Sequence, residues 1–283
     1  IDLHIHTHFS DGRDSPAEVL HRAAQMGMKT LAITDHDNAN GTREALPLAQ
    51  ALGLELIPAV EFTCHWSQCN TPPGKGDIDV LAYFVNLDDA EFQAFEQATL
   101  GDIHARIAEC CSFLTMDGYT IFLEDVFEQN PRYAGLLQLM MAVQAKGYIP
   151  DWEEVIAVVE QYWRRVRLSR FTIQELIDRI HRAGGVAVLA HPIAVSCDGS
   201  WISAKQLESL VEAGLDGLEI YHHTVDETTR PYFQRLAEQF DLLVTGGSDE
   251  HGWFSDLKKL GSQPVTAAMV DALRARHTLY IDD

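Results

Sequence analysis

The chain has 283 residues, of which 46% are hydrophobic and 22% charged, so its composition excludes a disordered protein. Acidic residues number 42 and basic residues 21, which gives a formal net charge of −21. A surface this acidic repels polyanions, so neither long nucleic acid nor an anionic membrane is an expected partner. No run of about 18 apolar residues predicts a membrane span and no export signal is visible, so we expect a cytoplasmic protein.

The cysteines show no paired C-x-x-C spacing, and their number is odd. Together with the missing export signal, this predicts reduced thiols that are buried as small apolar residues. The five positions are Cys64, Cys69, Cys110, Cys111 and Cys197.

Strand-like and helix-like segments alternate in the first part of the chain, a pattern typical of a parallel sheet or barrel. The first helix has a clear start signal, because Ser15-Pro16-Ala17-Glu18 combines a capping box with proline at the first helical position. Helices are predicted at about 16–26 and 42–52, and strands at 1–5, 30–34, 55–62 and 78–84.

The pattern becomes mostly helical from about residue 88 to residue 167, with helices predicted at 89–116, 133–146 and 151–163. Alternation then resumes, with helices at about 172–184, 204–213 and 226–239 and strands at 186–190, 218–221 and 242–245. We therefore predict an α/β barrel formed by residues 1–87 and 168–283. A helical insertion at 88–167, close to the size of a small domain, is expected to cover the active site.

Side chains that can bind metal ions recur on these strands or directly after them. On a strand, residues i and i+2 project to the same face, so His4 and His6 can hold one ion together. In barrels, the loops at the carboxyl ends of the strands form the active site. The clusters are His4-Ile5-His6 with Asp11, Asp35-His36-Asp37, Glu61, His191-Pro192 and Asp249-Glu250-His251.

The chemistry of these side chains favours a catalytic metal centre. Imidazole nitrogen combined with carboxylate oxygen suits Zn, Mn, Fe or Co, and without thiolates a structural zinc site is not expected. Each cluster alone is as compatible with ordinary strand or loop residues. Their coincidence at five strand positions is what predicts a shared metal centre.

These motifs, from His4-Ile5-His6 to Asp249-Glu250-His251, resemble those of the PHP (polymerase and histidinol phosphatase) family. The resemblance covers nearly the whole chain and is strongest to stand-alone bacterial PHP phosphoesterases that act on small nucleotides. It implies a distorted (β/α)7 TIM-like barrel with a mostly helical insertion. It also implies two or three divalent metal ions, Mn²⁺ first, with Zn²⁺ or Fe²⁺ as alternatives.

The resemblance assigns metal ligands by position. His4 and His6 would hold one metal ion, and Asp11 and His36 would belong to a second. Glu61 would bridge ions. The implied ligand set is His4, His6, Asp11, His36, Glu61, Asp79, His191, Asp249 and His251.

The sequence departs from the family pattern at several positions. Asp79 stands where the family has a third-metal histidine, and it can still bind a metal ion. Leu136 and Gln138 stand at a family arginine and histidine, and Leu168 stands at a later histidine; these three cannot replace what is lost. The sequence therefore predicts a divergent member with two or three metal ions or with a different substrate.

The predicted reaction is hydrolysis of a phosphate ester. Water bound to the ions would lose a proton near neutral pH and attack, while the ions offset charge on the phosphoryl oxygens. A protonated side chain would assist the departing alkoxide, and the candidates are His222, His223 and His251. His222 and His223 are equally compatible with residues of a surface loop.

Several cations are candidates for binding the substrate, and in particular a second phosphate. They are Arg13, Lys75, Arg132 and Arg170, the last of these in a basic run with Arg164, Arg165 and Arg167. A solvated helix face is the alternative interpretation of that run.

The main hypothesis is a phosphomonoesterase that acts on a small nucleotide or another phosphorylated metabolite. One alternative is a phosphodiesterase, either a short-RNA 5′ exonuclease or a cyclic-phosphate hydrolase. Another is a degenerate PHP domain that binds without turnover. The oligomeric state is not predicted.

Overall fold

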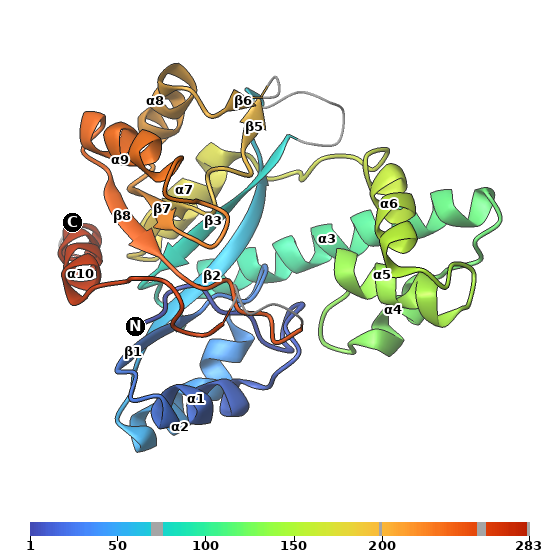
Figure 1. Ribbon diagram of the computed structural model, residues 1–283, viewed down its shortest axis with the longest axis horizontal. Helices are drawn as coiled ribbons and strands as arrows, with labels where there is room; N and C mark the ends of the chain where they lie inside the picture. The colour runs from blue at the N-terminus through green and yellow to red at the C-terminus, as the bar shows by residue number, and fades with distance from the viewer. Residues whose placement is uncertain (69–75, 198–199, 254–258, 282–283) are drawn as a thin grey trace.

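The structure, a computed structural model, describes residues 1–68, 76–197, 200–253 and 259–281. Within these ranges it contains ten helices, a six-stranded sheet and a small two-stranded sheet (Figure 1). The large sheet has the order β1 (Thr30–Ile33), β2 (Glu55–His65), β3 (Asp77–Tyr83), β4 (Val186–Leu189), β7 (Gly217–Tyr221) and β8 (Leu243–Gly246). Strands β5 (Ser196–Cys197) and β6 (Ser200–Trp201) pair with each other. The predicted mixed α/β class is confirmed.

One strand of the large sheet runs against the others. β1–β2, β4–β7 and β7–β8 pair in parallel, whereas β3 is antiparallel to both β2 and β4. The expectation of a parallel sheet is therefore wrong at β3. Only residues 66–76 separate β2 from β3, and a parallel pair needs a crossover of a dozen or more residues, usually with a helix. The pairing with β3 also extends β2 to His65, so Glu61 lies within this strand rather than at its end.

The N-terminal segment was predicted as a strand, but it forms only isolated bridges, from Asp2 to Leu31 and from Ile5 to Glu250. Side-chain hydrogen bonds replace part of the strand ladder, because the Asp2 carboxylate accepts from the backbone amides of His4 and Ser248 at 3.3 and 2.9 Å. The segment thus contacts β1 on one side and the chain after β8 on the other.

Most helices lie close to their predicted positions. The capping box at α1 is confirmed, since the Ser15 side chain accepts from the Glu18 amide. α9 begins later than predicted because the Asp226 carboxylate accepts from the amides of Thr228 and Thr229 in a turn. These helices are α1 (Pro16–Gln25), α2 (Asn40–Leu52), α3 (Ala90–Met116), α5 (Leu136–Ala145), α6 (Trp152–Trp163), α7 (Ile173–Arg182), α8 (Ala204–Glu212) and α9 (Arg230–Gln239).

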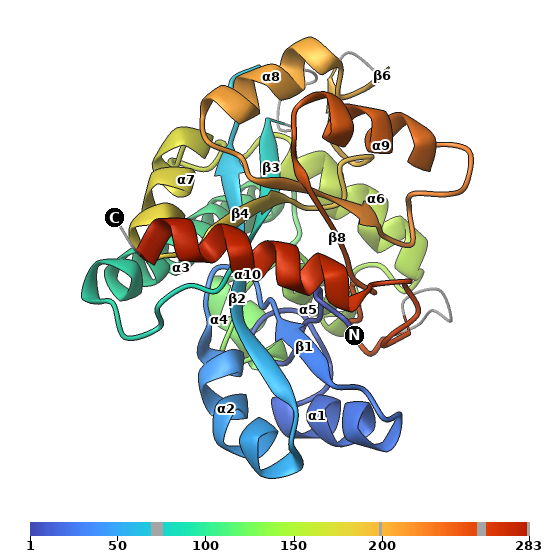
Figure 2. The ribbon, with the colours of Figure 1, turned by 90° about the vertical axis from the view of Figure 1, so that its left-hand side faces the viewer.

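Two helices were not predicted, α4 (Leu123–Gln129) and α10 (Ala267–Ile281). In Figure 2, α10 runs across the sheet, and it contacts β4 and β8. None of the helices in the described part of the chain is long and apolar enough to span a membrane. Cys64, Cys110 and Cys111 are buried free thiols, as predicted; Cys69 and the side chain of Cys197 lie outside the described residues.

Helices α4, α5 and α6 share an apolar cluster with the later part of α3, built around Ile107, Leu114, Val143 and Val159. The first turns of α3 belong elsewhere, because Phe92 packs with the sheet residues and α7. Figure 1 shows α4, α5 and α6 grouped to one side of the sheet, with α3 running from the sheet into this group. A single helix therefore takes part in two apolar cores.

Candidate metal centre

The predicted metal ligands converge in space, although they are far apart in the sequence. Glu61 is the common neighbour and is 1% exposed. Its Oε2 lies 3.1 Å from Nε2 of His4 and 3.1 Å from Nε2 of His6, while its Oε1 lies 3.0 Å from Nε2 of His191. His36 pairs with Glu61 in a parallel bridge just after β1, which places its Nδ1 3.6 Å from Oε2.

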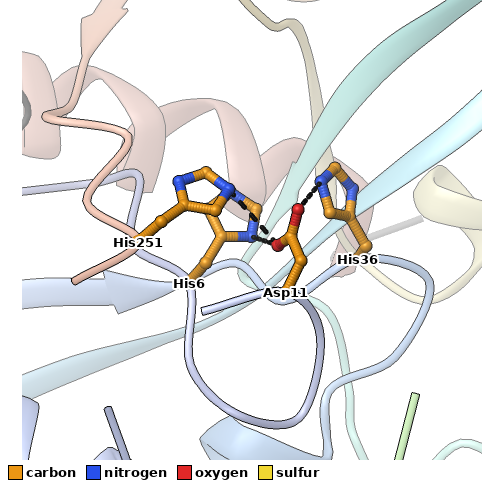
Figure 3. Close-up of side chains that lie close together, drawn as sticks. All are labelled: His6, Asp11, His36 and His251. Atoms are coloured by element: carbon orange, nitrogen blue, oxygen red, sulfur yellow. Dashed lines mark ion pairs between the residues drawn. The ribbon is translucent and has the colours of Figure 1, made fainter. Parts of the chain in front are cut away.

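One group of potential ligands surrounds the Asp11 carboxylate (Figure 3). Asp11 Oδ1 lies 3.2 Å from Nε2 of His251 and 3.6 Å from Nδ1 of His6, and its Oδ2 lies 3.8 Å from Nε2 of His36. In this group the ligand atoms all lie within 4.8 Å of one another. A single cation can therefore contact all four side chains.

Two further groups lie next to the first. His4, His6 and Asp249 form one, in which Asp249 Oδ1 is 3.4 Å from Nε2 of His6. Glu61, Asp79 and His191 form the other, with Asp79 Oδ2 3.9 Å from Nε2 of His191. His4 and His6 lie together in one of these groups, and His6 also belongs to the group around Asp11.

The donor set fits divalent cations. The Nδ1 atom of His4 lies 2.9 Å from Oε1 of Glu219. A neutral His4 donates that hydrogen to Glu219, so its Nε2 carries a lone pair and faces Nε2 of His6 at 3.1 Å and Oε2 of Glu61. Lone pairs that face one another in a buried site need a proton or a metal cation between them.

The pKa shifts at the centre point to the same need for positive charge. Burial alone would raise the pKa of Glu61, but the neighbouring His4 and His36 hold it well below its usual range. Burial would lower the pKa of His4, but the carboxylates of Glu219 and Glu61 raise it well above its usual range. Glu61 and Glu219 thus stay ionised and require cationic partners, whereas burial and the neighbouring Glu61 raise the pKa of Asp79.

Glu219 supports the ligands, and sequence reasoning missed it. It lies on β7 with 0% exposure; besides contacting His4, its Oε2 accepts a hydrogen bond from the amide of His191 at 2.9 Å. The available signal was a single carboxylate within the apolar strand Leu218-Glu219-Ile220. Such a carboxylate fixes the orientation and tautomer of a metal-binding histidine.

The loop that carries Asp11 is held by Asp35. The Asp35 carboxylate accepts hydrogen bonds from the amide and hydroxyl of Thr7 and from the hydroxyl of Ser10, each at 2.7 Å. Gln138, at the position of a family histidine, is 2% exposed and donates to the Ser10 carbonyl at 3.3 Å. Gln138 therefore connects α5 to this loop.

The backbone at the centre adopts conformations that side chains rarely take. His191 has a φ of 27° and Asp249 a φ of 55°, and positive φ in non-glycine residues often marks functional sites. Just before Asp249, the chain passes so close to His4 that a Cβ on Gly247 would lie 2.2 Å from the His4 Cβ. Only glycine allows this approach.

All three candidate proton donors lie at the centre or beside it: His222 and His223 form a further group with Asp249, with their ligand atoms within 4.8 Å of one another, and His251 Nδ1 lies 3.3 Å from Oδ1 of Asp249. His222 is 2% exposed, so the interpretation of this residue as part of a surface loop is wrong. Its Nε2 lies 3.4 Å from Oδ2 of Asp249, and its Nδ1 lies 2.7 Å from the hydroxyl of Thr224. His223 is partly exposed, and its ring centre lies 4.1 Å from that of His222.

The predicted substrate-binding cations lie at several places. Arg13 and Arg132 are exposed, with their guanidinium groups 6.0 Å from the Trp253 ring and 5.3 Å from the Phe9 ring. Arg170 stacks on Phe171 at 4.7 Å and donates to the Ala98 carbonyl. Lys75 lies outside the described residues.

A cavity of about 480 Å³ opens beside the metal centre. Asp11, His36, Asp79 and His191 line it on the side of the sheet, and α3, α5 and α6 line it on the other side. Arg13, Arg132 and Arg170 do not line it. A substrate in this cavity can therefore reach the candidate ligands directly.

Several known proteins of similar sequence are hydrolases of phosphate esters. A 5′-3′ exoribonuclease of Haemophilus influenzae is 30% identical over 92% of this chain and 93% of its own length. A phosphoribosyl 1,2-cyclic phosphate 1,2-diphosphodiesterase of Eggerthella lenta is 30% identical over 92% of this chain and 97% of its own length. A 3′,5′-nucleoside bisphosphate phosphatase of Chromobacterium violaceum is 26% identical over 89% and 87%.

The fold and the family agree with these relatives. A solved structure named as a metal-dependent phosphoesterase, from Bifidobacterium adolescentis, is 27% identical and superposes with a TM-score of 0.83 over 97% of this chain and 95% of its own. The family model described as the PHP domain matches residues 2–183. The chain is therefore an enzyme of the phosphoesterase class, and it belongs to the PHP domain family.

Proposed function

We propose that this chain is a phosphomonoesterase that acts on a small nucleotide or another small phosphorylated metabolite. The observation that carries the proposal is the convergence of histidines and carboxylates from distant segments on the buried carboxylate of Glu61, next to an open cavity. Of the relatives, the phosphatase of Chromobacterium violaceum is named for a phosphomonoester substrate.

We propose two or three divalent ions as the cofactors, Mn²⁺ first, with Zn²⁺ or Fe²⁺ as alternatives. When bound, such ions lower the pKa of water and offset charge on phosphoryl oxygens. The three groups of side chains around Asp11, Asp249 and Asp79 are the proposed holders. Asp79 keeps a ligand atom in the third group even though the family histidine is missing there.

The chain's own groups would handle the proton of the leaving alcohol. We propose His222 as the donor, because its Nε2 faces Asp249 while the Thr224 hydroxyl fixes the opposite ring nitrogen. His223 and His251 remain the other candidates. Arg13, Arg132 and Arg170 stay candidates for contacts with parts of the substrate outside the cavity, and Lys75 stays a candidate on the sequence alone.

The barrel and the domain division also belong to this proposal. The N-terminal segment bonds to β1 through the amide of Ala32 and to the chain after β8 through the amide of Asp249. We propose that it acts as the seventh strand of a distorted (β/α)7 TIM-like barrel made of residues 1–87 and 168–283. Residues 88–167 would be the insertion that covers the site.

Phosphodiester hydrolysis is the second candidate. Its support is the naming of two relatives at 30% identity, one as an exoribonuclease and one as a cyclic-phosphate diesterase. The net charge of −21 argues against long RNA as the substrate. A non-catalytic domain is not favoured, because the predicted ligands lie together.

The test is a substrate panel with the purified protein, stripped of metal and then loaded with Mn²⁺. The panel holds phosphomonoesters, a cyclic phosphate, an open phosphodiester and a short 5′-phosphorylated RNA. Phosphate release from monoesters, lost in Glu61→Gln, is expected. Cleavage of diesters alone would move the assignment to the second candidate, and no cleavage of any ester would refute both.

A further inference from the structure

The groups of potential metal ligands differ in the donor atoms that they offer. The group around Asp11 contains three imidazoles and one carboxylate, and the group of Asp249 with His4 and His6 contains two imidazoles and one carboxylate. The group of Glu61, Asp79 and His191 reverses this proportion, with two carboxylates and one imidazole. We call this last set the oxygen-rich group.

Glu61 is shared between groups, so its contribution has to be counted in each of them. Its Oε2 lies 3.1 Å from Nε2 of His4 and of His6, which brings a second carboxylate to the group around Asp249 and makes nitrogen and oxygen donors equal there. Its Oε1 lies 3.0 Å from Nε2 of His191. Among the candidate groups in the described part of the chain, oxygen donors outnumber nitrogen donors only in the oxygen-rich group.

A hydroxyl on the neighbouring strand holds the second carboxylate of the oxygen-rich group. Thr63 of β2 stands directly opposite Asp79 of β3 in the antiparallel register, so the two side chains lie on the same face of the sheet. The Thr63 hydroxyl donates to Oδ1 of Asp79 at 2.6 Å. The other oxygen, Oδ2, lies 3.9 Å from Nε2 of His191. A partner of this kind fixes the orientation of a carboxylate that binds a metal ion.

The oxygen-rich group also opens onto the cavity. Thr63, Asp79 and His191 all line it, and the side chains of Asp79 and His191 are 26% and 20% exposed. Water can therefore add further oxygen ligands to a cation held there. Mg²⁺ usually keeps several water ligands, and carboxylate and water oxygens suit Mn²⁺ as well, whereas imidazole suits Zn²⁺ and Fe²⁺.

We infer that the metal centre is not uniform: the oxygen-rich group binds its own ion, which is Mn²⁺ or Mg²⁺ even when the imidazole-rich groups hold Zn²⁺, and Thr63 is the positioning residue for that ion. The inference rests on the proposed function and deepens it by giving one group a class of metal. Zn²⁺ binds most sites with nitrogen and oxygen donors more tightly than Mn²⁺ does. The selection is therefore relative, and the advantage of Zn²⁺ is smallest in the oxygen-rich group.

The first test titrates the metal-free protein with Mn²⁺ in a calorimeter, with no ester present. Asp79→Ala should bind one Mn²⁺ ion fewer per chain than wild type, and this identifies the ion of the oxygen-rich group. Thr63→Val should lower the affinity for that same ion about 10- to 100-fold and leave the other ions unchanged. Thr63→Ser, which keeps a hydroxyl, should bind Mn²⁺ nearly as wild type does.

Thr115→Val is the matched control. Thr115 is also partly buried, but its hydroxyl contacts only the backbone of the helical segment around Tyr119 and Ile121. It should titrate like wild type. The inference is overturned if Asp79→Ala loses no ion, if Thr63→Val titrates like Thr115→Val, or if Thr63→Val weakens every ion equally.

The second test adds Zn²⁺ stepwise to the Mn²⁺-loaded protein and measures the Mn²⁺ that is released. The last Mn²⁺ ion to leave wild type should be the one that Asp79→Ala lacks. Asp79→His exchanges an oxygen donor for a nitrogen donor, and it should lower the Zn²⁺ concentration that displaces this last ion about tenfold or more. Release of all Mn²⁺ at one Zn²⁺ concentration, or an unchanged profile in Asp79→His, would contradict the inference.

Both tests measure metal binding rather than turnover, so they separate this inference from the proposed function. A protein that hydrolyses no ester but keeps one Mn²⁺ ion against Zn²⁺ refutes the proposed function alone. An active phosphomonoesterase whose ions all exchange together refutes this inference alone.

Discussion

Oε1 of Glu219 lies 2.9 Å from Nδ1 of His4, on the side of the imidazole that faces away from Glu61. This contact fixes the hydrogen on Nδ1 and leaves Nε2 as the atom that can bind a cation. We predict that Glu219→Gln lowers the affinity for Mn²⁺ about 10- to 100-fold, as measured by calorimetric titration. Glu212→Gln, an exposed residue of α8, is the control; unchanged affinity in Glu219→Gln would show that the contact does not serve the metal.

Glu61 should matter more than any other single ligand, because it contacts His4, His6 and His191. We predict that Glu61→Gln lowers kcat at least about 100-fold, since loss of one metal ion removes several kcal/mol of transition-state stabilisation. Steady-state kinetics and elemental analysis of the same sample test this. Wild-type turnover together with a reduced metal content would contradict the role given to Glu61.

Removal of metal should affect stability as well as activity. The carboxylates of Asp11, Glu61 and Asp249 lie close together, so bound cations stabilise the folded state. Saturation at 100 times Kd stabilises a protein by about 2.7 kcal/mol. We expect chelation to lower Tm, and Mn²⁺ to restore both Tm and activity, whereas Na⁺ at matched ionic strength should restore neither.

Away from the metal centre, Asp216 should make a large contribution to the free energy of unfolding. This side chain is 1% exposed and accepts hydrogen bonds from His181, Arg276 and Tyr280 at 2.9, 2.7 and 2.7 Å, which attaches α10 to α7. Loss of one partner of such a buried network costs about 3 kcal/mol. We predict that Asp216→Asn lowers the free energy of unfolding by this amount, measured in urea at pH 7. Asp271→Asn, a change at an exposed position of α10, should leave it almost unchanged.

The same residue gives a pH dependence. Burial would raise the pKa of Asp216, but the hydrogen bonds from His181 and Tyr280 lower it below the usual value of 3.8. A lowered pKa in the folded state means that the stabilisation is present above pH 3.8 and is lost as the pH falls through the folded-state pKa. The difference in unfolding free energy between wild type and Asp216→Asn should therefore shrink below about pH 4. A difference that does not change with pH would contradict the assignment of this stabilisation to the ionised form of Asp216.

Most of the candidate ligands could be proposed from the sequence because they follow local rules, whereas Asp79 was implied only by the family resemblance. His4 and His6 are two residues apart in an extended segment, and His36 and His191 directly follow apolar strands. Such patterns depend on near neighbours in the chain. The structure brings the same residues together, and the helices with capping boxes start where predicted.

Other features depend on contacts that sequence patterns do not report. The reversal of β3 follows from the short connection to β2, and the function of Glu219 depends on His4, which is 215 residues away. In the sequence, Gln138 stands at the position of a family histidine that it cannot replace. In the structure, its side-chain amide donates a hydrogen bond to the Ser10 carbonyl. For Glu219 and Gln138 a long-range partner determines the outcome, and a single sequence carries no record of that partner.

The 27-residue helix α3 has a mechanical consequence for the enzyme. At about 40 Å in length, it joins the cluster around Phe92 to the cluster around Ile107 without a break. The four carboxylates and five imidazoles of the predicted ligand set belong to segments outside α3–α6, whereas Ile103 and Arg106, in the middle of α3, line the cavity beside the metal centre. Gln138 of α5 holds the Ser10 carbonyl in the loop that carries Asp11, so local unfolding of α4–α6 would open the cavity and would also loosen one part of the metal centre.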